Sequence, residues 1–390
     1  MSEPADERHM RRALQLAERG LAGTDPNPRV GCVLVRAERT VGEGWHERAG
    51  GPHAEVMALR QAGADAEGAS AYVTLEPCAH TGRTPPCVAA LISAGVRRVV
   101  FAVSDPNPLV NGAGASALRA AGVQVREGVL AAEARALNPG FFKRMQCGLP
   151  WVRLKLAASL DGRTALADGR SRWITGEAAR ADVQRFRARS SVVLTGSGTV
   201  LADDPALNVR LADTPRQPLR VLLDGALRVS PDARMLHPAN EALVFTASTD
   251  PARRAELERR GVRVEIAAAG PDGRLLLAPI LRRLGELEAN EVWIEAGARL
   301  AGAWLREQLV DELIIYLAPR LLGPGARPLL QLPAPADLEQ APRLRFTECV
   351  PLGEDLRLSA LPLAPGAPTG GGPTGGGPTN AAPTDAAAAQ

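Results

Sequence analysis

HAEVMALRQAGADAEGASAYVTLEPCAHTGRTPPC, residues 53–87, is the stretch from which the fold and chemistry of the first half of the chain can be worked out. It contains His53, Cys78 and Cys87, which are ligands of the kind that zinc prefers. A catalytic zinc keeps three protein ligands and leaves its fourth position to water. Glu55, two residues after the histidine, would then carry protons and would not bind the metal.

This ligand set is the arrangement of the zinc enzymes that deaminate nucleobases, in which a glutamate moves protons while water replaces an amino group. Their usual Pro-Cys-x-x-Cys ending is absent, because eight residues separate Cys78 from Cys87. The longer loop still lets the ligands converge, but it argues against the ordinary cytidine or tRNA-adenosine branch. His80 is a substitute ligand, although we favour a loop or substrate role for it. The alternative for each ligand is a metal-free residue of a reduced core.

Composition excludes several other classes. The 390 residues suffice for two domains, and no apolar run is long enough to span a bilayer. Residues 1–20 are charged and lack a signal-peptide core, which predicts a cytoplasmic protein. Five cysteines without disulfide-like spacing suit a reducing compartment and a metal. A net charge of +3 and 3% aromatic residues argue against nucleic-acid binding.

Hydrophobic periodicity predicts alternating helices and strands in the first half. The expected elements are a helix over 6–20, strands over 30–35 and 41–44, a helix from 53, a strand over 71–75, a helix over 87–94, a strand over 96–103, and a helix, the strand 123–125 and a last helix within 113–138. This alternation indicates an α/β sandwich with the metal at the strand ends. The positive end of the helix that opens at His53 would favour an ionised Glu55.

The second half begins after a connector-like stretch over 144–150, with a strand over 151–156. Residues 151–362 carry no Gly-x-Gly-x-x-Gly fingerprint. Two glycine-rich turns, 195–199 and 296–299, each follow a β-rich run and could bring backbone N–H groups to a phosphate. The alternative is that glycine serves there only for its freedom at positive φ. Residues 367–382 repeat Pro-Thr-Gly-Gly-Gly, so we interpret 363–390 as a disordered tail.

Taken together, these residues resemble a known family, the bifunctional riboflavin-biosynthesis proteins, in which a pyrimidine deaminase is fused to a pyrimidine reductase. The resemblance covers roughly residues 5–360. It rests on PNPxVGC at 26–32, HAEV at 53–56, TLEPC at 74–78 running on to GRTPPC at 82–87, KLAASLDGR at 155–163, WIT at 173–175, LADDP at 201–205 and EAG at 295–297. The eight-residue spacing between the two cysteines is the family's own.

The resemblance implies a cytidine-deaminase-like α/β/α sandwich over 1–146, a connector over 147–150 and a dihydrofolate-reductase-like α/β domain over 151–362. It also implies one Zn²⁺ per chain, NADPH, a pyrimidine ribosylamino phosphate as the small-molecule substrate, and a homo-oligomer of two or more chains. No nucleic-acid or membrane partner is expected. The implied reactions are hydrolysis of a ring amino group and then reduction of the opened ribose.

Carried over by motif, His53, Cys78 and Cys87 match the zinc ligands and Glu55 the proton donor. The implied cofactor contacts are Ala157, Trp173, Thr199, Asp203, Gly297, Ala298, Arg299, Leu300, Ala301, Gly302 and Ala303. The implied substrate contacts are Ser171, Arg187, Leu207, Arg210 and Glu295. A forked guanidinium suits a 5′-phosphate, although Arg187 alone would read as a solvated helix position.

Two other readings stay open. One is a base deaminase that acts on tRNA, which the weak charge, scarce aromatics and large second domain disfavour. The other is a non-catalytic zinc protein in which one half has decayed into a scaffold. Intact His53, Glu55, Cys78 and Cys87 argue against decay of the first half. Asp203, Arg210 and Glu295 argue against decay of the second. Of the remaining histidines, His9 and His237 are expected to be solvent-exposed.

Overall fold

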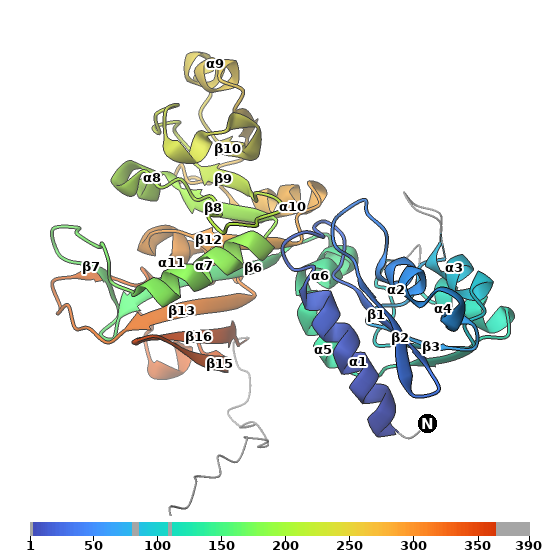
Figure 1. Ribbon diagram of the computed structural model, residues 1–390. Coiled ribbons are helices and arrows are strands. Elements are labelled where there is room, and N and C mark those ends of the chain that lie inside the picture. Colours follow the sequence, from blue (N-terminus) through green and yellow to red (C-terminus); the bar gives the residue numbers. More distant parts are fainter. Residues whose placement is uncertain (1–2, 80–85, 108–110, 364–390) are drawn as a thin grey trace, which may run out of the picture.

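The computed structural model describes residues 3–79, 86–107 and 111–363, and in these ranges each half of the chain builds a sheet of its own (Figure 1). The first sheet has five strands in the order β2-β1-β3-β4-β5. The second has nine strands in the order β11-β10-β9-β8-β12-β6-β13-β16-β15. The α/β fold that the alternating pattern predicted for the first half is confirmed, as is the α/β fold that the resemblance implied for the second.

The first half contains helices on both faces of its sheet. Its elements are α1 (Glu3–Glu18), β1 (Gly31–Arg36), β2 (Arg39–Trp45), α2 (Ala54–Ala62), the short η1 (Gly63–Ala66), β3 (Ser70–Val73), α3 (Cys87–Ser93), β4 (Arg98–Phe101), α4 (Ala113–Ala120), β5 (Gln124–Glu127), α5 (Ala131–Leu137) and α6 (Pro139–Cys147).

Strand β1 shows why this sheet is covered twice. Cys32 and Leu34 pack into one core with α2, α3 and α4, whereas Val33 and Val35 pack into another with α1, α5 and α6. Side chains alternate along a strand, so a run that is apolar at every position must be buried on both faces. Figure 1 shows the two helix groups on opposite sides of the sheet, which is the predicted α/β/α sandwich.

The end of this half differs from the prediction. A single last helix and a connector from Arg144 were expected, but the chain forms α5 and then α6, which runs on to Cys147. Asn138 lies between the two helices, and Pro139 occupies the first turn of α6. Proline begins a helix readily because its fixed φ is helical and its missing N–H is not needed there. Buried Phe141 and Phe142 then anchor α6 in the core.

The second half contains the elements β6 (Trp151–Ser159), β7 (Arg163–Ala165), α7 (Glu177–Arg189), β8 (Val192–Gly196), α8 (Ser197–Asp203), β9 (Leu219–Leu223), η2 (Arg234–Leu236), η3 (Ala239–Glu241), β10 (Ala242–Thr246), α9 (Pro251–Arg259), β11 (Arg263–Ile266), α10 (Leu277–Glu286), β12 (Glu291–Glu295), α11 (Ala298–Arg306), β13 (Glu312–Ala318), β14 (Arg327–Pro328), η4 (Leu338–Gln340), β15 (Leu344–Leu352) and β16 (Asp355–Pro362). Helices α7, α8 and α9 share a core with one face of the sheet, and α10 and α11 with the other.

The topology of this sheet brings the ends of two parallel strands, and the helices that follow them, to one edge. Strands β8 and β12 are neighbours and run parallel, so their carboxyl ends lie at the same edge. Helix α8 begins directly after β8, and α11 begins two residues after β12. Open α/β sheets bind ligands at such an edge.

None of the helices in the described ranges is long and apolar enough to cross a membrane. The predicted tail lies almost wholly outside the described residues, which end at 363.

Candidate active sites

The predicted zinc ligands meet at one point of the first half. His53 lies just before α2, Cys78 follows β3, and Cys87 is the first residue of α3. The His53 Nδ1 atom lies 3.2 Å from the Cys87 Sγ atom and 3.7 Å from the Cys78 Sγ atom. The three ligand atoms all lie within 4.8 Å of one another.

These distances are close to those expected around a tetrahedral zinc, with the His53–Cys87 pair somewhat shorter. Zn–S bonds of about 2.3 Å and Zn–N bonds of about 2.0–2.1 Å place two ligand atoms about 3.5–3.8 Å apart. One histidine nitrogen and two sulfurs also match zinc in softness and leave a fourth position open. A hydrogen bond from Cys87 lowers the pKa of the Cys78 thiol, which favours the thiolate that a metal needs.

Glu55 lies in the first turn of α2 beside these ligands, and its residue is only 3% exposed. Burial raises the pKa of Glu55, and the neighbouring His53 opposes this rise. A buried carboxyl with a raised pKa can both take and release a proton near neutral pH.

Asn27 and His46, for which the sequence predicted no role, lie next to the predicted zinc ligands. The His46 Nδ1 atom lies 3.0 Å from the Pro52 carbonyl oxygen and must donate to it. The His46 Nε2 atom is then an acceptor for the Asn27 amide, 3.1 Å away. The His46 and His53 rings meet edge to face, with centroids 5.4 Å apart. Asn27 belongs to the PNP motif, so its signal was present in the sequence, whereas His46 carried none.

Glu76 is a second buried carboxylate that the sequence did not single out. It accepts hydrogen bonds from the backbone N–H groups of Asp105, Gly112 and Ala115. These groups lie before and at the start of α4, so Glu76 ties the end of β3 to the start of that helix. Its role is structural.

The predictions for the other three histidines have different outcomes. His80 lies outside the described residues. His237 is exposed, as expected. The prediction for His9 is wrong, since it is 8% exposed and its ring packs 4.9 Å from that of Tyr72.

The two glycine-rich turns of the second half lie side by side. The Thr195 hydroxyl donates to the Glu295 carbonyl oxygen at 2.6 Å. A Cβ on Gly196 would lie 2.7 Å from the Leu300 side chain, and one on Gly297 would lie 4.0 Å from the Thr199 hydroxyl. Gly196 and Gly297 have negative φ, so positive φ is not what these glycines supply. They allow α8 and α11 to begin close together.

The predicted cofactor residues are not all equivalent. Thr199 and the start of α11 are brought together at this edge, and Ala157 is half-buried on β6 next to β12. Trp173 is 62% exposed, with the Arg180 guanidinium 4.7 Å over its ring. Asp203 is exposed at the end of α8, and Ala303 is half-buried in the middle of α11.

Two residues of the 297–303 stretch face the interior instead. Ala301 belongs to the core, and a Cβ on Gly302 would lie 2.1 Å from the Gln331 carbonyl oxygen. Their side of α11 packs against the protein. The residues that begin the helix, Gly297, Ala298, Arg299 and Leu300, are exposed or half-buried.

Among the predicted substrate residues, Arg187 and Glu295 bind each other. The Arg187 Nε and Nη2 atoms donate to the two carboxylate oxygens of Glu295 at 2.6 and 3.0 Å. Arg187 is 7% exposed, so the solvated-helix interpretation is wrong. Burial would raise the pKa of Glu295, but Arg187 and Lys155 outweigh it and lower that pKa to about 2. Lys155 pairs in register with Glu295 and was not predicted.

The other three predicted substrate residues differ in which of their atoms a ligand could reach. Arg210 is exposed, and its guanidinium makes no hydrogen bond or ion pair with any described residue. Leu207 is buried in the core at φ 52°, so it can offer a ligand only its backbone. Ser171 is half-buried in the loop before α7. Arg210 therefore has the free fork that Arg187 lacks.

Comparison with known proteins agrees with this division. Residues 3–103 match the family described as the cytidine and deoxycytidylate deaminase zinc-binding region. Residues 150–358 match the RibD C-terminal domain. The first match covers the half with the predicted zinc ligands, and the second covers the half with the predicted cofactor and substrate residues.

Whole-chain relatives cover both halves together. The riboflavin biosynthesis protein RibD of Escherichia coli is 49% identical over 365 residues, which span 90% of this chain and 98% of the relative. The solved structure of Acinetobacter baumannii RibD superposes with a TM-score of 0.87 at 46% identity, covering 93% of this chain and all of that one. A Thermotoga maritima structure of a diaminohydroxyphosphoribosylaminopyrimidine deaminase/5-amino-6-(5-phosphoribosylamino)uracil reductase gives a TM-score of 0.82 at 33% identity, covering 93% and 99%. This chain therefore belongs to the RibD family of riboflavin-biosynthesis enzymes, which join a zinc-binding deaminase domain to a reductase domain.

Proposed function

We propose that this protein catalyses two consecutive steps of riboflavin biosynthesis. The first site would hydrolyse the 2-amino group of 2,5-diamino-6-ribosylamino-4(3H)-pyrimidinone 5′-phosphate, and the second would reduce the opened ribose of the product to a ribityl chain with NADPH. The observation that carries this proposal is the convergence of three zinc-type ligand atoms beside the buried Glu55. The name of the T. maritima relative, which pairs these two activities, supports the choice of substrate.

In the first step, His53, Cys78 and Cys87 would hold one Zn²⁺ per chain. When bound, the ion supplies the Lewis acidity that activates the attacking water. Glu55 would take one proton from that water and pass it to the ring nitrogen, and would then pass the second proton of the water, taken from the oxygen now bound to the ring carbon, to the amino group that leaves as ammonia, acting as general base and then general acid. The hydrogen bond between Asn27 and His46 gives the neighbouring wall of the site a fixed orientation.

In the second step, NADPH would lie across the edge where α8 and α11 begin. Its proposed contacts are Ala157, Trp173, Thr199, Asp203 and residues 297–303. Ala301 and Gly302 are included in this stretch, although their side of α11 packs against the protein. The cofactor supplies the chemistry of hydride transfer, so the protein needs mainly to position the sugar against the nicotinamide. The preference for NADPH over NADH rests on the resemblance.

For the substrate of this step, we assign the 5′-phosphate to Arg210, whose guanidinium has no partner among the described residues. The Arg187–Glu295 pair would form a rigid polar wall for the sugar, because each side chain holds the other in place. Ser171 and the Leu207 backbone complete the proposed contacts. The enzyme would act in the cytoplasm as a homo-oligomer, with domains over 1–146 and 151–362.

A panel of amino-bearing substrates tests the proposal against a tRNA or nucleoside deaminase. Purified protein of measured zinc content would be given the diaminopyrimidinone ribosylamino 5′-phosphate, cytidine, dCMP and tRNA in turn, and ammonia would be followed. We expect zinc near one per chain and ammonia from the first compound alone. Ammonia from tRNA or cytidine, and none from the diaminopyrimidinone, would reject the proposed substrate.

A further inference from the structure

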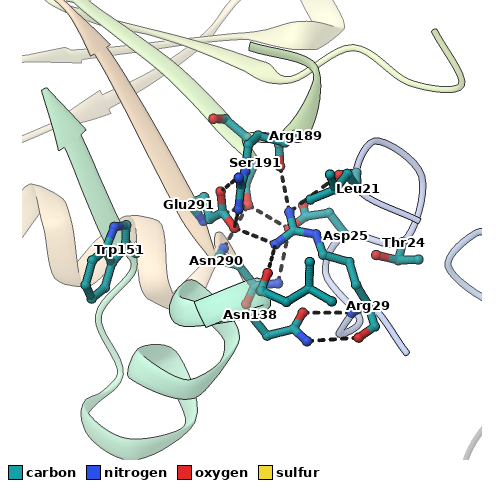
Figure 2. Close-up of polar contacts among 12 residues, drawn as sticks. Leu21, Thr24, Asp25, Arg29, Asn138, Trp151, Arg189, Ser191, Asn290 and Glu291 are labelled. Atoms are coloured by element: carbon teal, nitrogen blue, oxygen red, sulfur yellow. Dashed lines mark hydrogen bonds and ion pairs between the residues drawn. The ribbon is translucent and has the colours of Figure 1, made fainter. Parts of the chain in front are cut away.

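The two halves of the chain meet across a buried cluster of charges (Figure 2). At its centre is Glu291, the first residue of β12, whose side chain is 1% exposed. Arg29 of the deaminase half donates to its Oε1 atom at 2.5 Å. Arg189 donates to the Oε2 atom at 2.9 Å, and Arg153 also binds that oxygen. Burial would raise the pKa of Glu291, but the three arginines outweigh it and hold the pKa well below its ordinary value.

Arg29 makes a second contact across the same boundary. Its Nη2 atom donates to the backbone carbonyl oxygen of Arg189, the last residue of α7, at 3.0 Å. The last carbonyls of a helix lack intrahelical partners and carry partial negative charge, so a cation is favourable there. One guanidinium from the deaminase half thus holds the end of α7 and the start of β12 together.

These two elements also carry the proposed substrate wall of the reductase. Between α7 and β12 run three contacts in succession: Arg189 with Glu291, Phe186 stacked on Trp293 at 4.8 Å, and Arg187 with Glu295. Strand β12 is fixed by ladders to β8 and β6 on both sides. Helix α7 has no such ladder, so its last turn is the part that Arg29 can hold or release.

We propose that Arg29, although it belongs to the deaminase half, is a positioning residue for the reductase site. It fixes the last turn of α7 against β12 and thereby sets where Arg187 stands relative to Glu295. The inference rests on the proposed role of Arg187 and Glu295 as substrate contacts. It predicts that the reductase depends on a side chain of the other domain.

The same change should leave the deaminase site intact, because the Arg29 backbone is held independently of its side chain. The Asn138 amide accepts from the Arg29 N–H at 2.8 Å and donates to its carbonyl oxygen at 2.9 Å. The Pro26 carbonyl oxygen is held by the Asn290 side chain at 2.8 Å. Asn27, which borders the zinc ligands, therefore keeps its place when the guanidinium is removed.

The test uses the full-length, zinc-loaded chain as Arg29→Met and Arg29→Lys. Lys143→Met is the matched control, because Lys143 also bridges the halves, binding Asp311 at 2.6 Å, but makes no hydrogen bond or ion pair with the described residues of α7 or β12. In Arg29→Met, Glu291 keeps Arg153 and Arg189, so no buried carboxylate is left unpaired. We expect the KM for the deaminated ribosylamino phosphate to rise about tenfold, within the hundredfold that a misplaced group can cost.

The pattern of effects separates positioning from general damage. The KM for NADPH and the rate of ammonia release should not change in Arg29→Met, and Lys143→Met should change none of the three. Arg29→Lys should fall between wild type and Arg29→Met, because it keeps a charge for Glu291 but has no fork for the Arg189 carbonyl. If Arg29→Met fails to fold, the lysine variant carries the test.

A second readout does not depend on activity. Hydrogen exchange at the amides of the last turn of α7 should be faster in Arg29→Met than in wild type or Lys143→Met. Unchanged exchange there, or a KM for the pyrimidine that moves no more than in Lys143→Met, would overturn the inference. A wild-type chain that reduces no pyrimidine substrate would reject the proposed function instead, while the exchange rates would still show whether Arg29 holds α7.

Discussion

At the scale of single residues, burial decides what each charged group in the two sites can do. Arg187 and Arg210 are the same residue type and were both predicted to contact the substrate. Arg187 is buried and bound on its forked edge by Glu295, whereas Arg210 is exposed and unpaired among the described residues. Glu55 and Glu295 differ likewise, since burial raises the pKa of Glu55 while cationic neighbours lower that of Glu295. Residue type alone does not separate these roles.

Replacement of Glu55 by Gln should abolish deamination without removing zinc. Glu55 is not among the ligand atoms, so metal content should stay at the wild-type value, while ammonia release should fall by about 10²–10⁴-fold because the proton carrier is lost. NADPH oxidation with substrate that has already been deaminated should persist and serves as the control. Loss of both activities would contradict the assignment of two separate sites.

Replacement of Arg210 by Met should weaken recognition of the phosphate. Hydrogen bonds to charged groups contribute about 1.5–3 kcal/mol, so the KM of the reductase for the phosphorylated pyrimidine should rise about 10- to 100-fold. The KM for the dephosphorylated compound should not move. Arg259→Met, on exposed α9, is a control that should behave as wild type. Equal effects on both compounds would show that Arg210 does not bind the phosphate.

The low pKa of Glu295 should appear as acid sensitivity. A carboxyl whose pKa is lowered by folding adds stability above its unfolded value of 4.5, and this stability is lost as pH falls toward about 2. The contribution at neutral pH is on the order of 3 kcal/mol. Glu295→Gln should therefore lower the free energy of unfolding at pH 7 and flatten its decline between pH 4.5 and 3, as measured in urea. A variant as steep as wild type would contradict the assigned shift.

At the scale of secondary structure elements, the two helices that begin at the reductase edge differ in how tightly their glycines are packed. Helix α11 lies so near the 331 backbone that a Cβ on Gly302 would lie 2.1 Å from the Gln331 carbonyl oxygen. Gly198, in the first turn of α8, has no atom within 4 Å of its Cβ position. These two glycines lie in neighbouring helices, yet the packing constrains only one of them.

Gly302→Ala should destabilise the protein by about 1–3 kcal/mol, because the added methyl must push α11 away from the backbone that it contacts. The displacement should also weaken NADPH binding at the start of the helix. Gly198→Ala should keep wild-type stability or gain slightly, since alanine is the better helix former. Thermal unfolding of the two variants compares them directly, and equal melting temperatures would refute the packing account.

Patterns local in the sequence predicted most elements and the zinc ligands. A short apolar run such as Val30–Val35 predicts a buried strand. The combination of His53, Cys78 and Cys87 predicts a zinc site. What the sequence could not show are pairings between distant residues. Arg187 and Glu295 are 108 positions apart, and Arg29 and Glu291 are 262 apart. Their partners depend on how two sheets and two halves pack, which no periodicity records. His46 was missed for the same reason.

At the scale of the whole molecule, the two sites lie on separate sheets and share one charged boundary. The predicted zinc ligands belong to the five-stranded sheet and its helices, and the Arg187–Glu295 pair to the nine-stranded sheet. Each site can therefore be damaged without the other, and Arg29 is the deaminase-half residue whose loss we expect to impair the reductase alone. Because the proposed product of the first site is the substrate of the second, the two activities should appear in a fixed order.

The most direct test of this order follows ammonia release and NADPH oxidation together on one sample of zinc-assayed protein given the diaminopyrimidinone ribosylamino 5′-phosphate. Ammonia should appear without NADPH, and NADPH should be oxidised only after deamination, with zinc near one per chain. Ammonia release with no NADPH oxidation at any time would leave a deaminase joined to a domain of another purpose. Neither activity in zinc-loaded protein would contradict the pyrimidine assignment altogether.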